Sequence, residues 1–263
     1  MTDAERRFVA VGDVRLEYRL VPAARPAMPV LVFLHQGLGS VSMWRDMPDR
    51  LAARTGCAAL AYSRLGHGWS DPLPAPHRSD FMLAEGRTML PQVLAALGIG
   101  DVVLVGHSDG GTIALAYLAA GHKARGAIVV APHVMGEAIT RNAIAAQNAN
   151  WAGSALRRRL QRHHRDADAM FRAWAAVWLS EDLREWSIAD LLPRITVPLL
   201  AIQGHDDSHG TMRQVDEIAQ RAAGPITVEK LAQCGHDPFR DQPQQMLALC
   251  ARFVAGLAPM PIG

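Results

Sequence analysis

The sequence predicts an α/β fold, a mostly parallel eight-stranded sheet flanked by helices, with a helical segment inserted between two of the strands. Two observations lead to this prediction. Short apolar runs rich in β-branched residues alternate with longer segments of helical period. The later short runs are apolar throughout, as in strands that are covered on both faces. With 263 residues, the chain is long enough for one large domain with a modest insertion.

Eight segments are expected as strands, and the first two are joined by a hairpin turn at Gly12-Asp13. In chain order the expected strands are Phe8–Val11, Val14–Leu20, Val30–Leu34, Ala58–Tyr62, Val102–Val105, Ala127–Val130, Leu199–Gln203 and Thr227–Leu231.

Helices are expected between the strands, where apolar residues recur with a period near 3.6. One spans Asp80–Leu97, with Pro91 predicting a kink, and another spans Thr112–Ala120; each is followed by a glycine. The last helix is expected to start near Asp241, with Pro243 in its first turn.

One region breaks the alternation of strands and helices. Between residues 134 and 192 no strand pattern occurs, and the sequence is helical and rich in arginine and tryptophan. We therefore expect a helical cap or lid at residues 134–192, on a core made of residues 1–133 and 193–263. The basic run LRRRLQRHHR, residues 156–165, is expected to be a solvated helix face.

Composition and charge are those of an ordinary soluble globular protein. The chain is 49% hydrophobic and 20% charged, and its formal net charge is +2, which gives no reason to expect nucleic acid or an acidic membrane as a partner. The sequence contains neither a membrane-spanning apolar stretch nor a targeting signal, so a cytoplasmic location is expected. The three cysteines show no close pairing and are expected to be reduced and packed.

The segment VVLVGHSDGG, residues 102–111, carries the first chemical signal. An apolar strand turns sharply into a helix at Ser108, and a side chain at such a turn is presented above the carboxyl edge of the sheet. This G-x-S-x-G pattern in a strand–turn–helix context predicts that Ser108 is a nucleophile rather than only a helix cap. The backbone N–H of Asp109 then lies at a helix N-terminus, free to face a developing negative charge.

A serine nucleophile needs a base, and the base needs an orienting acid. The loop AQCGHDPF follows the last expected strand and supplies His236 as general base. The loop GHDDSHG follows the preceding strand; Asp206 and Asp207 compete as the acid, and Asp207 is favoured. A metal site in the same loop is the weaker interpretation, because its ligands are crowded and no partner motif accompanies them, so neither metal nor cofactor is expected.

A glycine-rich turn after the strand Val30–Leu34 is expected to complete the site. It reads Gln36-Gly37-Leu38-Gly39 and has backbone amides free to bind an oxyanion. Gly37 is the expected second donor beside Asp109.

These motifs resemble the α/β-hydrolase fold superfamily over the whole chain. The resemblance rests on the segments FLHQGLGSVSMW, YSRLGHGWSD, GHSDGG, QGHDD and CGHDP. In that superfamily the acid usually stands three residues after the glycine that ends its strand, which implies Asp207, and a helical lid covers the site. The common His-Gly-x oxyanion motif matches only if Gln36 replaces its glycine, which leaves the identity of the second amide open.

The sequence is similar to small bacterial hydrolases near the esterases, enol-lactonases and meta-cleavage-product hydrolases. A serine at position 108 separates it from haloalkane dehalogenases and epoxide hydrolases, which have aspartate there. The expected function is a serine hydrolase that cleaves an ester or lactone of a small, apolar or aromatic substrate through an acyl-enzyme. Two alternatives are C–C bond hydrolysis of a meta-cleavage-type diketone and non-catalytic binding of a small molecule.

Four residues are candidates for the substrate pocket. Trp174 and Trp178 lie four residues apart and could point down over Ser108, or else anchor the lid to the core. Gln36 belongs to the oxyanion turn. Arg64 could hold a substrate carboxylate, although a structural ion pair is preferred.

Overall fold

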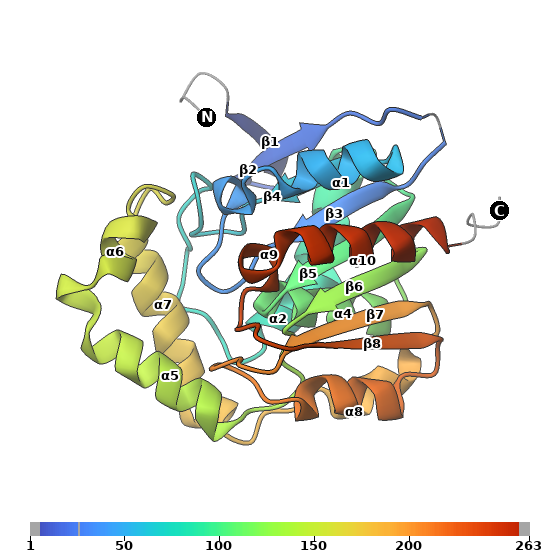
Figure 1. The fold of residues 1–263 in the computed structure, drawn as a ribbon. Coiled ribbons are helices and arrows are strands. Elements are labelled where there is room, and N and C mark those ends of the chain that lie inside the picture. Colours follow the sequence, from blue (N-terminus) through green and yellow to red (C-terminus); the bar gives the residue numbers. More distant parts are fainter. Residues whose placement is uncertain (1–5, 26, 258–263) are drawn as a thin grey trace.

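The apolar runs of the sequence form a single eight-stranded sheet in the computed structural model, which describes residues 6–25 and 27–257 (Figure 1). The strands are β1 (Arg7–Val11), β2 (Val14–Val21), β3 (Val30–Leu34), β4 (Ala58–Tyr62), β5 (Val102–His107), β6 (Gly126–Val130), β7 (Leu199–Gly204) and β8 (Ile226–Leu231). Their order in the sheet is β1-β2-β4-β3-β5-β6-β7-β8. Strand β2 is antiparallel to both neighbours, and all later pairings are parallel. The predicted fold class and its eight strands are confirmed.

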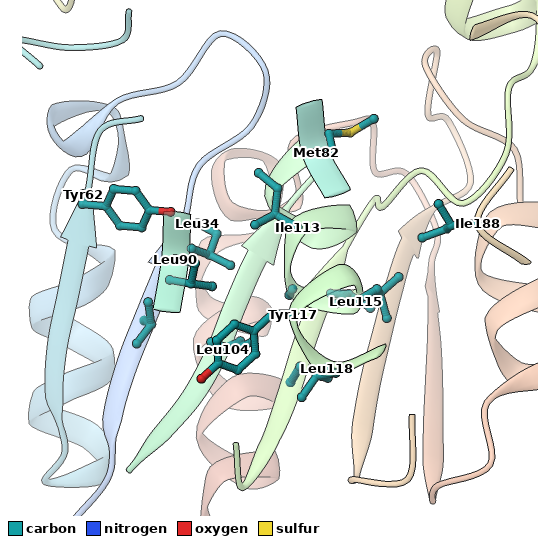
Figure 2. Close-up of a cluster of buried hydrophobic side chains, with 14 of the residues drawn as sticks. Leu34, Tyr62, Met82, Leu90, Leu104, Ile113, Leu115, Tyr117, Leu118 and Ile188 are labelled. Carbon is teal, nitrogen blue, oxygen red and sulfur yellow. The ribbon is translucent and has the colours of Figure 1, made fainter. Parts of the chain in front are cut away.

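The two faces of the sheet are covered by different helices, because side chains alternate along each strand. Val103 and Val105 of β5 face a core shared with α1 (Met47–Thr55) and α10 (Pro243–Ala255). Leu104 faces the opposite core, which Figure 2 shows packed against side chains of α4 (Asp109–Ala119). The central strands are thus buried on both faces, as their uninterrupted apolar sequence predicts.

The expected helix at Asp80–Leu97 is broken into three parts. These are α2 (Phe81–Ala84), a π-helical turn (Glu85–Met89) and α3 (Leu90–Ala96). Pro91 has no backbone N–H to donate to the preceding turn, and the chain changes its hydrogen-bond pattern just before the proline.

The remaining core helices differ from expectation mainly at their ends. Helix α4 starts at Asp109, three residues earlier than expected, because the turn at Ser108 leads directly into it. The last helical segment is divided into α9 (Pro238–Asp241) and α10 by Gln242, whose φ of −136° is not helical. The core also contains α8 (Arg213–Arg221) and a 3₁₀ turn at Val41–Trp44.

The segment from 134 to 192 is helical and contributes no strand to the sheet. It contains α5 (Ala138–Ala149), α6 (Ala155–Leu160), α7 (Ala167–Leu179) and 3₁₀ turns at Trp151–Gly153, Glu181–Leu183 and Ala189–Arg194. Helices α5–α7 lie to one side of the sheet, past the ends of its strands (Figure 1). Their role as a lid stays a prediction, and residues 1–5 and 258–263 of the expected core lie outside the described residues.

All three cysteines, Cys57, Cys234 and Cys250, are free and buried, as expected. Among the described residues, no helix combines the length and apolar character needed to cross a membrane.

The turn from β5 into α4 is tight enough to require glycine. A Cβ on Gly106 would collide with the carbonyl oxygen of Gly110, and one on Gly110 with that of Leu34. Ser108 itself has φ 53° and ψ −120°, a conformation that non-glycine residues rarely adopt. Helix α4 therefore starts in direct contact with the ends of β3 and β5.

Gly110→Ala is expected to lower the free energy of unfolding by about 3 kcal/mol, because the backbone of β3 has to move away from the new methyl group. The melting temperature should fall by roughly 10 °C, measured by thermal unfolding. Gly100→Ala is the matched control, since nothing lies within 4 Å of the added Cβ there. Equal melting temperatures for the two variants would contradict the close approach.

Candidate active site

Three loops at the carboxyl edge of the sheet bring Ser108, His236 and Asp207 together. Ser108 Oγ lies 3.0 Å from His236 Nε2. His236 Nδ1 lies 2.9 and 2.8 Å from the two carboxylate oxygens of Asp207. Of the two competing acids, Asp206 is exposed, and only Asp207 contacts His236. The arrangement has the geometry of a nucleophile, a base and an orienting acid.

The Asp207 carboxylate is buried and held by several donors. It accepts hydrogen bonds from Gln203 Nε2 (2.6 Å) and from the backbone N–H groups of His209 (2.7 Å) and Gly210 (3.1 Å). Burial raises its pKa, but the hydrogen bond and charge of His236 lead the interactions that lower it, and the net pKa is below the usual value. The group is therefore ionised when His236 needs a partner.

The backbone of His236 is also held by a hydrogen bond from the end of β5. His107, the last residue of β5, donates from Nε2 to the His236 carbonyl oxygen at 2.7 Å. The same strand thus ends beside both the serine and the base.

The sequence offers His205, Asp206, Asp207 and His209 as crowded candidate metal ligands in one loop, but the structure brings together a different group of side chains. Asp207, His209 and His236 have ligand atoms within 4.8 Å of one another. However, both Asp207 oxygens already accept hydrogen bonds, and His236 is engaged at both ring nitrogens. Hydrogen bonding alone accounts for the convergence of these three groups.

Two groups of backbone amides face the serine from opposite loops. The N–H of Asp109 is in the first turn of α4, where helical acceptors are missing. The N–H groups of Gln36 and Gly37 have no hydrogen-bond acceptor among the residues that the structure describes. Both residues line the cavity beside Ser108, so either amide can act as the second oxyanion donor.

Arg64 and His67 hold this oxyanion loop by its carbonyl oxygens. Arg64 donates to the carbonyl oxygens of His35 (2.7 Å) and Gln36 (3.3 Å), and His67 Nε2 donates to that of Gly37 (2.9 Å). Arg64 is 5% exposed and is not among the residues lining the cavity. Its contacts are those of a structural group rather than of a substrate ligand.

A cavity of about 340 Å³, here called the Ser108 cavity, lies over the serine. Trp174 and Trp178 of α7 both line it, on the side opposite the sheet edge. Trp174 Nε1 also donates to the Asp109 carboxylate at 3.2 Å. The two tryptophans therefore both face the cavity and anchor α7 to the core.

A fourth side chain, His133, contacts the serine and was missed in the sequence. Its Nε2 lies 3.3 Å from Ser108 Oγ, and Thr112 Oγ1 bonds both its carbonyl oxygen and its backbone N–H. Burial lowers the pKa of His133 to about 3, so the ring is neutral. Its Nδ1 is buried with no partner among the described residues, which favours the tautomer that donates from Nε2 to Ser108. Its position in the loop that follows β6, at the carboxyl edge of the sheet, was the available signal.

The sequence profile of the alpha/beta hydrolase family matches residues 31–249. The chain belongs to this family. An uncharacterized protein of Mycobacterium tuberculosis is 32% identical over 127 residues, covering 44% of this chain and 35% of that protein, so the match spans about a third of the relative. The resemblance noted in the sequence is confirmed at the level of the superfamily.

Solved structures of other members of the alpha/beta hydrolase family share the fold. Proline iminopeptidase from Mycobacterium smegmatis has a TM-score of 0.71 and 20% identity, covering 95% of this chain and 98% of that one. The esterase EaEST from Exiguobacterium antarcticum has a TM-score of 0.74 and 18% identity, with coverages of 95% and 99%. Likeness at these identities concerns the fold, and family membership supports a hydrolase as the class of enzyme.

His133→Phe is expected to slow reaction of Ser108 with a fluorophosphonate roughly tenfold, because it removes one donor to the serine oxygen. The shape of the pH dependence between pH 5 and 8 should not change, since His133 does not titrate there. Labelling rates of His133→Phe and His133→Gln across this range are the measurement. Gln keeps an N–H donor and should recover part of the rate; an altered pH profile in Phe would contradict the assignment.

Acid is expected to destabilise the fold through its buried histidines. Burial lowers the pKa of His77, His164 and His209 to about 4, so the unfolded chain binds more protons below pH 6.5. The free energy of unfolding should therefore fall as the pH drops from 7 to 5, by roughly 2 kcal/mol per histidine. Urea unfolding of His164→Gln should show a smaller fall than the parent, and an equal fall would contradict this account.

Proposed function

We propose that this protein is a serine hydrolase that cleaves a carboxylic ester or lactone of a small, apolar or aromatic substrate through an acyl-enzyme. The observation that carries the proposal is the 3.0 Å contact between Ser108 Oγ and His236 Nε2, with Asp207 on the other imidazole nitrogen. Membership of the alpha/beta hydrolase family and an esterase among the structural neighbours support it.

The reaction begins when Ser108 attacks the substrate carbonyl. His236 takes the serine proton, and the negative charge of Asp207 stabilises the imidazolium that forms. The amides of Asp109 and of Gly37, or its neighbour Gln36, bind the oxyanion. His236 returns the proton to the leaving oxygen and then activates the water that releases the acid.

The helical segment 134–192 is proposed as the cap over a core of residues 1–133 and 193–263. Its side chains Ile144, Leu160, Trp174 and Trp178 line the Ser108 cavity and give it apolar walls. A small apolar acyl or aryl group fits such walls, and the partner is a small molecule.

An amide substrate is the second candidate. One structural neighbour is a proline iminopeptidase, and three carboxylates line the cavity, to which a free amino group of a substrate would bind: Asp206, Asp237 and Asp241. Hydrolysis rates for p-nitrophenyl esters, a prolyl p-nitroanilide and a meta-cleavage-type diketone rank these chemistries. Ester turnover below that of the anilide or the diketone would overturn the ester assignment, and no turnover would favour a binding protein.

Ser108→Ala is expected to abolish fluorophosphonate labelling and to lower kcat for p-nitrophenyl hexanoate by at least about 10⁴-fold, because it removes the hydroxyl group that contacts His236 Nε2. Asp207→Asn should lower kcat by a similar order, with KM little changed, since the amide no longer stabilises the imidazolium. Asp190→Asn is the control, because that side chain is exposed and does not line the Ser108 cavity. Labelling of Ser108→Ala at the parent rate would refute the proposal.

A further inference from the structure

A second cavity continues from the Ser108 cavity toward solvent. This outer cavity has a volume of about 230 Å³ and is lined in part by Trp44, Arg45, Arg50, Arg159, Phe239 and Arg240. Gln36, Met43, Arg159, Asp237 and Arg240 line both cavities, so the two share a common boundary. A ligand bound at Ser108 can therefore extend into the outer cavity.

The outer cavity carries an excess of positive charge. Four arginines line it, against the two carboxylates of Asp46 and Asp237. Asp46 lies 4.0 Å from Arg50, and Asp237 accepts from the backbone N–H of Arg240 at its own helix start. Neither Arg45 nor Arg159 has a carboxylate partner within 4.0 Å in the described parts of the chain. Arg240 Nε, by contrast, lies 3.4 Å from a carboxylate oxygen of Asp241. Arg45 and Arg159 are therefore the guanidinium groups of this lining that are available to an anion.

The positive charge of these arginines also lowers the pKa of a neighbouring histidine, His163. His163 lines the outer cavity and bonds Ser42 Oγ through Nδ1 at 2.8 Å. Burial lowers its pKa first, and the charges of Arg162, Arg159 and Arg45 lower it further. Three positive charges therefore act on His163, and two of them, Arg45 and Arg159, line the outer cavity.

Apolar side chains complete the outer cavity. The rings of Trp44 and Phe239 pack edge to face, with centroids 5.2 Å apart, and Met43 lies at the boundary with the Ser108 cavity. Apolar contact surface for a substrate chain is therefore present beside the arginines.

The arginines of α6 differ in what they contact. Arg157 pairs with Asp168, and Arg158 donates to the carbonyl oxygen of Gly153 on the outside. Only Arg159 of the three lines the two cavities. The basic run of the sequence is therefore not a uniform solvated face.

We propose that the outer cavity is an anion subsite, and that the substrate is an ester whose apolar chain ends in a carboxylate or phosphate bound by Arg159 and Arg45. This inference rests on the proposed function and adds the substrate class to it. The scissile carbonyl lies at Ser108 and the anion lies at the far end of the same molecule.

The test compares matched substrates that differ only in the terminal charge. p-Nitrophenyl half-esters of straight-chain dicarboxylic acids are assayed beside their methyl-capped forms, which places the anion in the acyl part. Hexanoyl esters of 7-hydroxycoumarin-3-carboxylic acid and of 7-hydroxycoumarin place it in the leaving group. The parent protein should prefer the anionic member of one pair about tenfold in kcat/KM, and 0.5 M NaCl should reduce that preference.

Arg159→Gln and Arg45→Gln should each reduce this selectivity severalfold, and the double variant should abolish it, whereas Arg159→Lys should keep part of it. Arg158→Gln is the matched control, because it removes one charge from the same helix outside both cavities. Competition by octyl phosphate, octanoate and octanol separates phosphate from carboxylate binding, and either anion should inhibit better than the alcohol.

Two results would overturn the inference. The first is hydrolysis of the capped esters with no preference for the anionic member of either pair. The second is an equal loss of selectivity in Arg158→Gln and Arg159→Gln. Either result rejects the anion subsite but leaves the proposed hydrolase function standing. If no ester is hydrolysed and Ser108 does not react with a fluorophosphonate, the proposed function fails, and the inference fails with it.

Discussion

The close contact between α4 and the ends of β3 and β5 is the constraint on which the site depends. It requires glycine at positions 106 and 110 and holds Ser108 at a φ of 53°, at a cost of about 1–3 kcal/mol. The hydrogen bond from Ser108 N–H to the Val130 carbonyl oxygen, at 2.8 Å, and the buried sheet around it maintain that conformation. The same turn aims Ser108 Oγ at His236 and leaves the first amides of α4 free. Strain in the turn and the position of the nucleophile therefore have one cause.

A buried carboxyl group follows from this geometry, because the residue after the serine is Asp109. Burial raises the pKa of this group above its usual value, although Arg64 and the hydrogen bond from Trp174 act to lower it. Arg64 lies 3.9 Å from this carboxylate and also donates to two carbonyl oxygens of the oxyanion loop. One guanidinium thus joins the turn at Ser108 to the loop that supplies the second oxyanion amide, and α7 is connected to both through Trp174. Removing the side chain of Arg64, Asp109 or Trp174 would take a hydrogen-bonding or charged partner away from a buried polar group.

The sequence predicts the sheet well because its signal is local, while the interactions that it misses join distant segments. Uninterrupted apolar runs mark the strands, and loops after successive parallel strands must meet at one edge, which is why Ser108, Asp207 and His236 could be proposed together. The π-helical turn before Pro91 was missed, because a helical period does not distinguish hydrogen-bond patterns that differ by one residue. His133 was missed because its role depends on Thr112 and Trp178, which come from α4 and α7. Arg159 and Arg240, which line both cavities, are likewise far apart in the chain, so the sequence does not predict that they lie at one boundary.

The separation of charges along the two cavities has a physical reason. In the proposed reaction His236 becomes an imidazolium, so a positive charge beside it would oppose the step, and a negative charge favours it. Asp207 is the carboxylate in contact with His236, and Asp206 and Asp241 line only the Ser108 cavity. Arg45 and Arg50 line only the outer cavity, and Asp237, Arg159 and Arg240 lie at the boundary of the two. An anion held among the arginines is kept away from the oxyanion, where a second negative charge would raise the energy of the transition state. A substrate with its charge at the far end from the scissile carbonyl satisfies both requirements.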